Sequence, residues 1–185
     1  MNVIPTRLAE VLIVEPKVFG DDRGFFLETY QQQRYAEAGI SCSFVQDNIS
    51  FSQRHTLRGL HFQHPQGQAK LVQVLEGEIY DVAVDVRRGS PTFGQWAGVM
   101  LSSETRRQLF IPAGFAHGFC VTSATALFMY KCSDYYAPDQ ESGLCWDDPD
   151  LKIEWPVAQP LLSARDQALP YLSRIAPERL PRYEV

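Results

Sequence analysis

The chain has 185 residues, of which 45% are hydrophobic and 21% are charged, and its formal net charge is −5. This length and balance predict one globular domain, residues 1–185, that can bury a core of its own. The acidic total, and runs of Lys and Arg no longer than two residues, argue against a nucleic-acid partner.

No apolar run approaches the roughly 20 residues that cross a bilayer, and residues 1–12 lack the long apolar core of a signal peptide. We therefore expect no membrane partner and a cytoplasmic location. The four cysteines, Cys42, Cys120, Cys132 and Cys145, show no Cys-x-x-Cys spacing. Free thiols are therefore preferred over a disulfide or a zinc site.

Short strand-like segments separated by Gly, Pro, Asn and Asp fill the first part of the chain. The best helix candidate is residues 31–38, which ends at Gly39, a residue that can cap a helix in the left-handed conformation. The predicted strands cover residues 11–14, 25–29 and 44–51, with a turn at 20–24.

The strand signal is densest between residues 57 and 131. Residues 71–75 and 78–86, joined by Glu76–Gly77, are predicted to form a hairpin. Further strands are expected at residues 96–101, 107–111, 117–122 and 126–132. Strands that recur roughly every 10 residues, with turn residues between them, predict a sandwich or a barrel.

The barrel core is expected over about residues 40–135. From Tyr136 the composition changes, and seven prolines lie between Pro138 and Pro181. Residues 136–185 are therefore predicted to be loops, 3₁₀ turns and short helices that wrap around the barrel.

Two segments point to a cupin barrel. Residues 112–117 read Pro-x-Gly-x-x-His, a turn and strand with which cupin barrels often present a metal-binding histidine. Residues 57–63 stand where such a barrel supplies His-x-His and a glutamate, but Gln63 replaces the second histidine and no acid follows before Leu75. Two imidazoles beside Lys70 do not suit a divalent metal, which needs three or four ligands. We predict no metal site and expect proton chemistry in its place.

Ionisable residues gather in the strand-like segments, where an inward-facing charge is expensive and needs a reason. A lone strand histidine such as His61 is usually structural, yet Lys70, His117 and Asp81 accompany it. Arg58 and His61 face opposite sides of a regular strand. Both can reach one pocket only if the glycine between them, Gly59, permits a bulge.

Asp81 and Asp85 share one face of a strand, about 13 Å apart. The carboxylates of a retaining glycosidase lie only about 5 Å apart, so the two aspartates must have separate roles. Asp81 can pair with His117 or Lys70, and a purely structural ion pair is an equally good interpretation. Asp85, near the strand end, is expected to be a turn or surface residue.

Four residues remain open to a functional or a structural interpretation. Tyr130 fits a core position in its strand, and the adjacent Tyr135 and Tyr136 can stack on a flat ring or simply pack. Asp166 follows Ser163 at the spacing of a helix N-cap. The carboxylate could instead orient a histidine, and the sequence does not show which one.

These segments together resemble the dTDP-4-dehydrorhamnose 3,5-epimerase family over nearly the whole chain. The matching blocks, in family order and at near-family spacing, are residues 16–26, 44–48, 57–63, 81–85, 90–96 and 111–119. The resemblance implies a mainly β fold, a cupin-like double-stranded β-helix or jelly roll with short peripheral helices. It also implies an isomerase without a cofactor, and a homodimer that exchanges N-terminal strands.

The resemblance implies a dTDP-linked substrate, dTDP-4-dehydro-6-deoxy-D-glucose, and the product dTDP-4-dehydro-L-rhamnose. It makes His61 the general base, Asp166 its partner, Tyr130 the acid on the opposite face of the sugar, and Lys70 the cation at the C4 oxygen. Tyr135 resembles a residue that stacks on thymine. The other implied substrate-binding positions are Arg23, Glu28, Gln46, Asp47, Asn48, Arg58, Asp81, His117, Glu141 and Arg165.

The main alternative is an enzyme that epimerises a dTDP-4-keto-6-deoxy sugar at C3 only or at C5 only, because such relatives share most of these motifs. A metal-dependent cupin oxygenase is disfavoured by Gln63 and Lys70. A non-catalytic sugar-binding cupin is disfavoured because His61, Lys70 and Tyr130 are all present.

Overall fold

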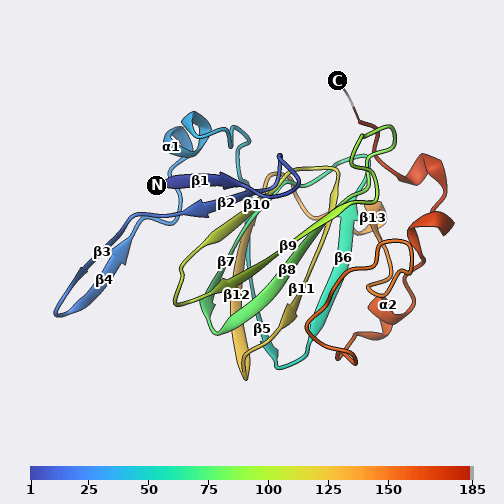
Figure 1. The fold of residues 1–185 in the computed structure, drawn as a ribbon. Helices are drawn as coiled ribbons and strands as arrows, with labels where there is room; N and C mark the ends of the chain where they lie inside the picture. The colour runs from blue at the N-terminus through green and yellow to red at the C-terminus, as the bar shows by residue number, and fades with distance from the viewer. Residues whose placement is uncertain (184–185) are drawn as a thin grey trace.

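The structure, a computed structural model, describes residues 1–183 and consists mainly of antiparallel strands in two facing sheets (Figure 1). Short helices lie at the periphery of the sheets. The fold is a cupin-like jelly roll, which confirms the predicted fold class.

The first sheet has six strands in the order β1-β2-β10-β7-β12-β5. Its strands are β1 (Asn2–Pro5), β2 (Leu12–Glu15), β5 (Gln46–Gln53), β7 (Lys70–Glu76), β10 (Gln108–Ile111) and β12 (Thr125–Cys132). Side chains alternate between the two faces of a strand, so in β12 Ala126, Phe128, Tyr130 and Cys132 share the face toward the second sheet. This alternation orients Tyr130 toward the space between the sheets.

The second sheet has five strands in the order β13-β6-β11-β8-β9. Its strands are β6 (Leu57–Gln63), β8 (Glu78–Asp85), β9 (Trp96–Ser102), β11 (Phe115–Val121) and β13 (Glu141–Gly143). Every residue of β11 and nearly every residue of β8 is buried. Both strands are covered on two faces, because the core packs on one side and the C-terminal segment on the other.

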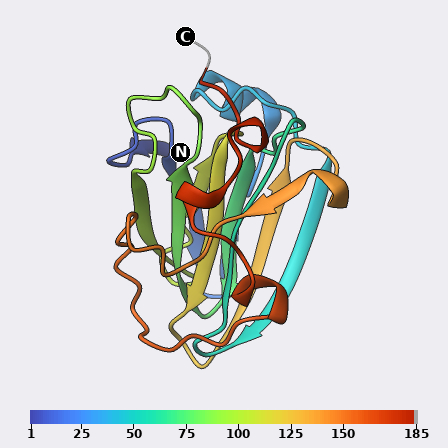
Figure 2. The same cartoon turned by 90° about the vertical axis from the view of Figure 1, so that its right-hand side faces the viewer.

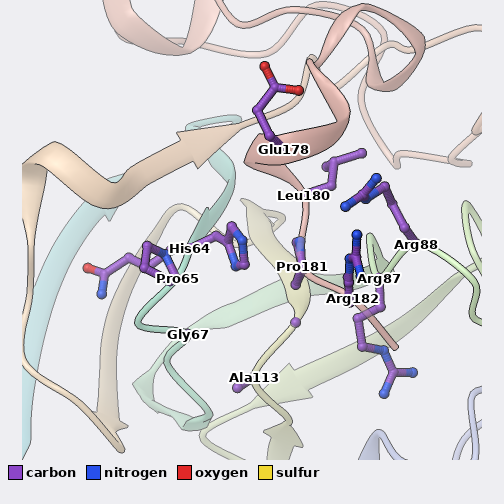
Figure 3. Close-up of a pocket in the computed structure, with 12 residues that line it drawn as sticks. His64, Pro65, Gly67, Arg87, Arg88, Ala113, Glu178, Leu180, Pro181 and Arg182 are labelled. Carbon is purple, nitrogen blue, oxygen red and sulfur yellow. The ribbon is translucent and has the colours of Figure 1, made fainter. Parts of the chain in front are cut away.

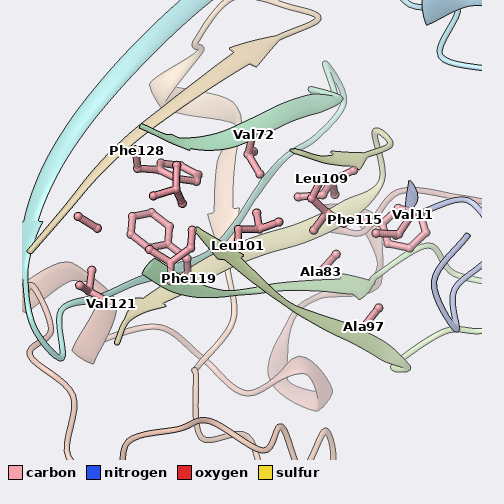
Figure 4. Packing of buried hydrophobic residues seen from close by; sticks show 14 of the residues in the cluster. Val11, Val72, Ala83, Ala97, Leu101, Leu109, Phe115, Phe119, Val121 and Phe128 are labelled. Carbon is pink, nitrogen blue, oxygen red and sulfur yellow. The ribbon is translucent and has the colours of Figure 1, made fainter. Parts of the chain in front are cut away.

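The main core lies between the sheets, where aromatic and branched side chains from both meet (Figure 4). Phe119 of β11 and Phe128 of β12 pack with ring centroids 4.4 Å apart. Removing a fully buried aromatic ring of this kind costs about 3–5 kcal/mol. This packing holds the two walls of the barrel together.

One predicted pairing is wrong. Strands β7 and β8 do not form a hairpin, because β7 pairs with β10 and β12, whereas β8 pairs with β9 and β11. The chain crosses from one sheet to the other at Gly77, which has φ +82°. A Cβ at this position would lie 2.1 Å from the carbonyl oxygen of Thr125, so only glycine fits. The short connection looked like a hairpin turn but is a corner of the jelly roll.

Asp85 is a turn residue, but it is buried and not at the surface. Its carboxylate accepts hydrogen bonds from Arg87, Ser90 and Thr92, and so closes the turn after β8. Burial alone would raise the pKa of Asp85, but these bonds outweigh it and the pKa lies below its usual value. A charged residue at a strand end can be buried when its turn supplies enough donors.

The N-terminal part includes a two-stranded hairpin, β3 (Val18–Asp21) and β4 (Gly24–Leu27), that projects away from the barrel (Figure 1). The helix α1 (Gln32–Glu37) follows it and lies within the predicted range 31–38. The side chain of Gln31 caps its start, and Gly39, with φ +95°, comes just after the C-cap Ala38 in the predicted left-handed conformation. No helix within residues 1–183 is both long enough and apolar enough to cross a membrane.

The C-terminal segment, coloured orange to red, lies across the outer face of the five-stranded sheet (Figure 2). It contains the predicted 3₁₀ turns and one short helix, together with the strand β13. These elements are η1 (Pro138–Gln140), α2 (Ala164–Gln167), η2 (Leu172–Arg174) and η3 (Pro177–Arg179). Leu144, Leu151 and Leu172 anchor the segment against Phe62 and Val84. The segment therefore holds α2 next to β6.

Candidate active site

A cavity of about 320 Å³ opens between the two sheets, on the side where α2 approaches β6. The strands β5, β7 and β12 supply one wall, and β6 and β11 supply the other. The lining residues are Ser50, Arg58, His61, Lys70, His117, Gly118, Phe119, Phe128, Tyr130, Ser163, Arg165 and Asp166. All four predicted catalytic residues lie in this one cavity.

His61 and Asp166 form a hydrogen-bonded pair, with Nε2 of the ring 2.6 Å from Oδ1 of the carboxylate. Ser163 caps α2 by accepting from the backbone N–H of Asp166, and its hydroxyl also donates to Oδ2. The sequence allowed two roles for Asp166, as part of a helix cap and as the partner of a histidine, and in the structure it has both. The residue pattern alone left open which histidine Asp166 meets, and the structure shows that it is His61, the partner that the family resemblance implied.

The Asp166 carboxylate is arranged to stay ionised. Burial alone would raise its pKa, but the hydrogen bonds from His61 and Ser163 and the nearby charges outweigh burial and lower it. An ionised carboxylate can only accept a hydrogen bond, so in the neutral ring Nε2 carries the proton. This tautomer leaves the lone pair of Nδ1 free to act as a base.

A bulge in β6 brings Arg58 and His61 to the same cavity, as predicted. His61 pairs with His117 of β11, and Arg58 pairs with Phe119, so β6 has one extra residue between these two pairs. Gly59 has φ +113°, and a Cβ there would lie 2.6 Å from the backbone of β11. The bulge turns the Arg58 guanidinium toward the cavity, where Nε donates to the Ser52 hydroxyl.

Lys70 is the first residue of β7 and faces the cavity. It pairs in register with Cys132 on the neighbouring strand β12. Burial lowers the pKa of its ammonium group, while the charges of Glu141 and Asp81 act in the other direction. No carboxylate lies within salt-bridge distance of Lys70 among the described residues. A buried cation of this kind is suited to meet negative charge on a bound molecule.

Tyr130 lies on β12 and combines the two roles that the sequence left open. Its ring packs against the core through Phe128, with centroids 5.6 Å apart, and it also lines the cavity. Burial raises the pKa of the Tyr130 hydroxyl above its usual value, so the phenol is protonated near neutral pH. The residue can therefore act as a proton donor.

His117 and Asp81 form a buried pair on the wall beside His61, with Nε2 2.9 Å from Oδ1. The pairing was one of the two predicted for Asp81. Burial lowers the pKa of His117 in spite of the neighbouring carboxylate. Through this pair β11 and β8 fix the ring of His117 at the cavity surface.

Glu141 of β13 connects several groups at the cavity rim. Its carboxylate lies 2.5 Å from Arg165, 3.9 Å from Nδ1 of His61 and 2.8 Å from the hydroxyl of Tyr136. Within residues 1–183 the ring of Tyr135, which is two-thirds exposed, makes no hydrogen bond of this kind. The structure thus connects Tyr136 to the site, and the stacking role that the resemblance implies for Tyr135 stays a prediction. Strand alternation could not decide between them, because both follow the end of β12.

On β5 the side chains alternate, so Gln46 and Asn48 face inward and hydrogen-bond each other. Asp47 faces the other side and pairs with Lys131 at 2.9 Å. Asp47 is therefore not brought to the cavity within this chain, a result that the two-residue period of a strand already predicts.

Arg23 and Glu28 also lie away from the cavity of their own chain. Arg23 is in the turn of the projecting hairpin, where it pairs with Asp21 at 2.6 Å. Glu28 follows the hairpin and pairs with Arg34 on α1. A role for either residue at the cavity requires a second copy of the chain.

A second cavity, of about 610 Å³, lies between the C-terminal segment and the loops after β6 and β8 (Figure 3). His64, Arg87, Arg88, Glu178 and Arg182 line it. It contains none of the predicted catalytic residues, so the smaller cavity is the better candidate site. Among residues 1–183 no three His, Cys, Asp or Glu side chains are grouped as metal ligands would be.

A jelly-roll cavity with a histidine–carboxylate pair on one wall, and a lysine and a tyrosine on the other, defines a cupin-like sugar epimerase. A family model described as dTDP-4-dehydrorhamnose 3,5-epimerase matches residues 5–174. The chain belongs to the dTDP-4-dehydrorhamnose 3,5-epimerase family, as the sequence motifs indicated.

The similar proteins are named as epimerases that act on dTDP-linked sugars. The dTDP-4-dehydrorhamnose 3,5-epimerase of Pseudomonas aeruginosa is 58% identical over 166 residues, 88% of this chain and 92% of that protein. The Shigella flexneri enzyme is 56% identical over 168 residues, 90% of this chain and 93% of its own. A solved structure of dTDP-6-deoxy-D-glucose-3,5-epimerase from Legionella pneumophila, in complex with dTDP-4-keto-L-rhamnose, is 56% identical. The superposition with that structure has a TM-score of 0.97 and covers 100% of this chain and 99% of the Legionella pneumophila chain.

Proposed function

We propose that this chain epimerises dTDP-4-dehydro-6-deoxy-D-glucose at C3 and C5 to give dTDP-4-dehydro-L-rhamnose. The observation that carries the proposal is that a histidine–carboxylate pair and a tyrosine lie on opposite walls of one cavity that also holds a buried lysine. The names of the similar enzymes, and the ligand in the Legionella pneumophila structure, support the same substrate class.

The chemistry of the substrate explains why one site can serve two carbons. C3 and C5 both flank the C4 ketone, so removal of a proton from either carbon gives an enolate with its charge on the same oxygen. Lys70 is the buried cation that meets this oxygen. A positive group already positioned where charge develops contributes several kcal/mol, because it need not reorganise during the reaction.

His61 is the general base. Asp166 holds Nε2–H, so Nδ1 takes the proton from carbon, and the carboxylate stabilises the imidazolium that results. Neutral imidazole is suited to this step near neutral pH.

Tyr130 is the general acid on the opposite face. It comes from the six-stranded sheet and His61 from the five-stranded sheet, so a sugar ring between them meets the base on one face and the phenol on the other. Proton removal by His61 followed by proton donation from Tyr130 inverts the configuration at carbon. The raised pKa of Tyr130 keeps the proton on the phenol until the enolate carbon takes it.

The cationic groups around the cavity are suited to the diphosphate. The Nε atom of Arg58 donates to Ser52, which leaves the terminal nitrogens of its guanidinium free for phosphate oxygens. Arg165 stands at the rim beside Glu141. Gln46, Asn48, Asp81, His117, Glu141 and Tyr135 remain predicted contacts of the nucleotide sugar. Tyr136 is a second candidate for stacking on thymine, because it hydrogen-bonds Gln46 and Glu141.

We further propose that the active form is a homodimer in which the β3–β4 hairpin lies on a second copy of the chain. The hairpin exposes Phe19, Phe25 and Phe26, each more than half accessible to solvent. The outer face of β5 exposes Ile49 and Phe51 to a similar extent, and β5 is an unpaired sheet edge. Exposed apolar surfaces of this kind mark protein interfaces. The exchange would carry Arg23 toward the cavity of the partner.

The central experiment is incubation of the protein with dTDP-4-dehydro-6-deoxy-D-glucose in D₂O, followed by NMR. Deuterium at both C3 and C5 is expected. Exchange at a single carbon would instead assign the chain to the single-site epimerases. His61→Asn, which keeps the size of the side chain but not its basicity, should abolish exchange at both carbons. Substantial exchange in that variant would remove His61 as the base.

The dimer is tested separately by sedimentation. Wild-type protein should sediment as a dimer, and Phe26→Asp, which adds a charge to the apolar hairpin, should shift it toward the monomer. A monomeric wild type that retains full activity would exclude the exchanged hairpin as part of the site.

A further inference from the structure

The inner face of β5 presents four polar side chains in a row: Gln46, Asn48, Ser50 and Ser52. Gln46 and Asn48 hydrogen-bond each other, and Ser52 accepts from Arg58. Ser50 differs from the others, because its hydroxyl is buried and has no hydrogen-bond partner within residues 1–183. A buried hydroxyl without a partner costs about 1–3 kcal/mol, so its presence needs an explanation.

The surroundings explain why the chain itself does not satisfy this hydroxyl. The residue paired with Ser50 on β12 is Phe128, which offers no acceptor from its side chain. Ser50 lines the same cavity as Arg58, His61 and Tyr130. Ser50 therefore lies in the wall of the cavity in which the substrate of the proposed reaction reacts, with its hydroxyl covered in the free protein.

Strand register indicates which end of the substrate Ser50 would meet. Lys70 and Gln46 lie at one level of the six-stranded sheet, since both pair with Cys132. Ser50 is four residues from Gln46, about 13 Å along β5. It is two residues from Ser52, which holds Arg58. Because Arg58 is proposed to contact the diphosphate, Ser50 lies toward the diphosphate and C1 end of the substrate.

We infer that Ser50 is a substrate-binding residue whose hydroxyl hydrogen-bonds an oxygen on the C1 side of the nucleotide sugar, either the C2 hydroxyl or the diphosphate. The inference rests on the proposed function for the identity of the ligand. A hydroxyl that is unpaired in the free protein and paired in the complex contributes to affinity, because binding removes the cost of leaving it unsatisfied. It lowers the stability of the free protein for the same reason.

The test compares Ser50→Ala with Ser52→Ala, a matched control on the same face of the same strand. Ser50→Ala removes an unsatisfied group, so its Tm without ligand should equal or exceed that of wild type, by up to about 3 °C. Ser52→Ala leaves the Arg58 Nε–H without its acceptor, so its Tm should fall. A fall for Ser50→Ala comparable with that of the control would overturn the inference, because the hydroxyl would then have a structural partner.

Affinity is measured by calorimetry with two probes, dTDP and the unreactive dTDP-glucose. Ser50→Ala should weaken binding of dTDP-glucose roughly tenfold, the equivalent of about 1.4 kcal/mol. An equal loss for dTDP assigns the contact to the diphosphate, whereas unchanged dTDP binding assigns it to the C2 hydroxyl. If wild type binds both probes and Ser50→Ala binds them equally well, the role of Ser50 is overturned while the proposed function stands. Failure of wild type to bind either probe would overturn the proposed function, and this inference with it.

Discussion

The Nε2 atom of His61 lies 2.6 Å from the Oδ1 atom of Asp166, although 105 positions separate the two residues in the chain. His61 is carried by a bulged strand of the barrel, and Asp166 by a four-residue helix in the C-terminal segment. The contact therefore depends on the packing of that segment across the outer face of the five-stranded sheet. Loss of this packing would therefore separate Asp166 from His61 and impair proton abstraction.

Replacement of Asp166 with Asn should lower kcat by about 100-fold or more, with a much smaller change in KM. The amide keeps the size of the side chain, but it can present its NH₂ group to His61 and stabilise the wrong tautomer. Steady-state kinetics with Ser163→Ala as a control would test this. Ser163→Ala loses the helix cap and about 1 kcal/mol of stability but keeps the carboxylate. Equal activity losses in the two variants would mean that Asp166 acts only by supporting α2.

Tyr130→Phe should separate proton removal from inversion. The base is intact in this variant, so deuterium should still exchange into C3 and C5, while formation of the inverted sugar slows by about 100-fold or more. NMR in D₂O measures exchange and inversion in the same sample. Inversion that keeps pace with exchange, or exceeds it, would show that another group returns the proton.

The pH dependence should report Lys70. Its pKa is lowered by burial, so the ammonium group loses its proton at a pH below the usual lysine value of about 10.4. The cation stabilises the enolate only below that lowered pKa, and kcat should therefore fall as the pH rises through it. Lys70→Met should lower kcat by about 100-fold and remove this alkaline limb. An unchanged limb in the variant would assign the titration to a different group.

Lys70→Met also allows a stability test with a definite sign. A lysine whose pKa is lower in the folded state than in the unfolded state opposes folding at every pH below the folded pKa. The methionine variant should therefore have a higher Tm than wild type at pH 7, and the difference should shrink as the pH rises toward the unfolded value. A lower Tm for the variant across that range would indicate that the ammonium group has a stabilising partner.

Gly59→Ala should damage both stability and activity. The added Cβ would lie 2.6 Å from the backbone of β11 at φ +113°, so the bulge must rearrange and His61 must move. We expect a loss of at least about 2 kcal/mol in the free energy of unfolding, with little activity in the folded fraction. Gly89→Ala is the control, because its φ is also positive, at +84°, but nothing lies within 4 Å of the added Cβ. It should cost about 1–2 kcal/mol and keep kcat. Equal effects in the two variants would contradict a role for the bulge.

Local patterns in the sequence were sufficient to identify the strands from β5 to β12, the helix α1 and its glycine end. Side-chain alternation and turn residues act over a few neighbouring positions, so they can be read without the fold. The bulge at Gly59 was also predictable, because Arg58 and His61 could reach one cavity in no other way. The motifs that identify the family are also short runs of neighbouring residues, so they too can be recognised without the fold.

The partners of these elements were decided only in three dimensions. The segment from β7 to β8 reads as a hairpin, yet it crosses between sheets, because each strand buries more surface against partners that are distant in the chain. Asp85 is buried because Arg87, Ser90 and Thr92 surround it. Tyr136 and not Tyr135 reaches Glu141, and strand alternation ends just before both.

Local residue patterns and the family motifs were enough to predict the fold class, the strand positions and the residue types available for proton transfer. Only the tertiary structure shows that β7 and β8 belong to different sheets, that Asp85 is buried, and that Ser50 has no hydrogen-bond partner within residues 1–183. The reason is physical, since propensity and alternation depend on near neighbours, whereas hydrogen-bond pairing and burial depend on which distant surfaces pack together.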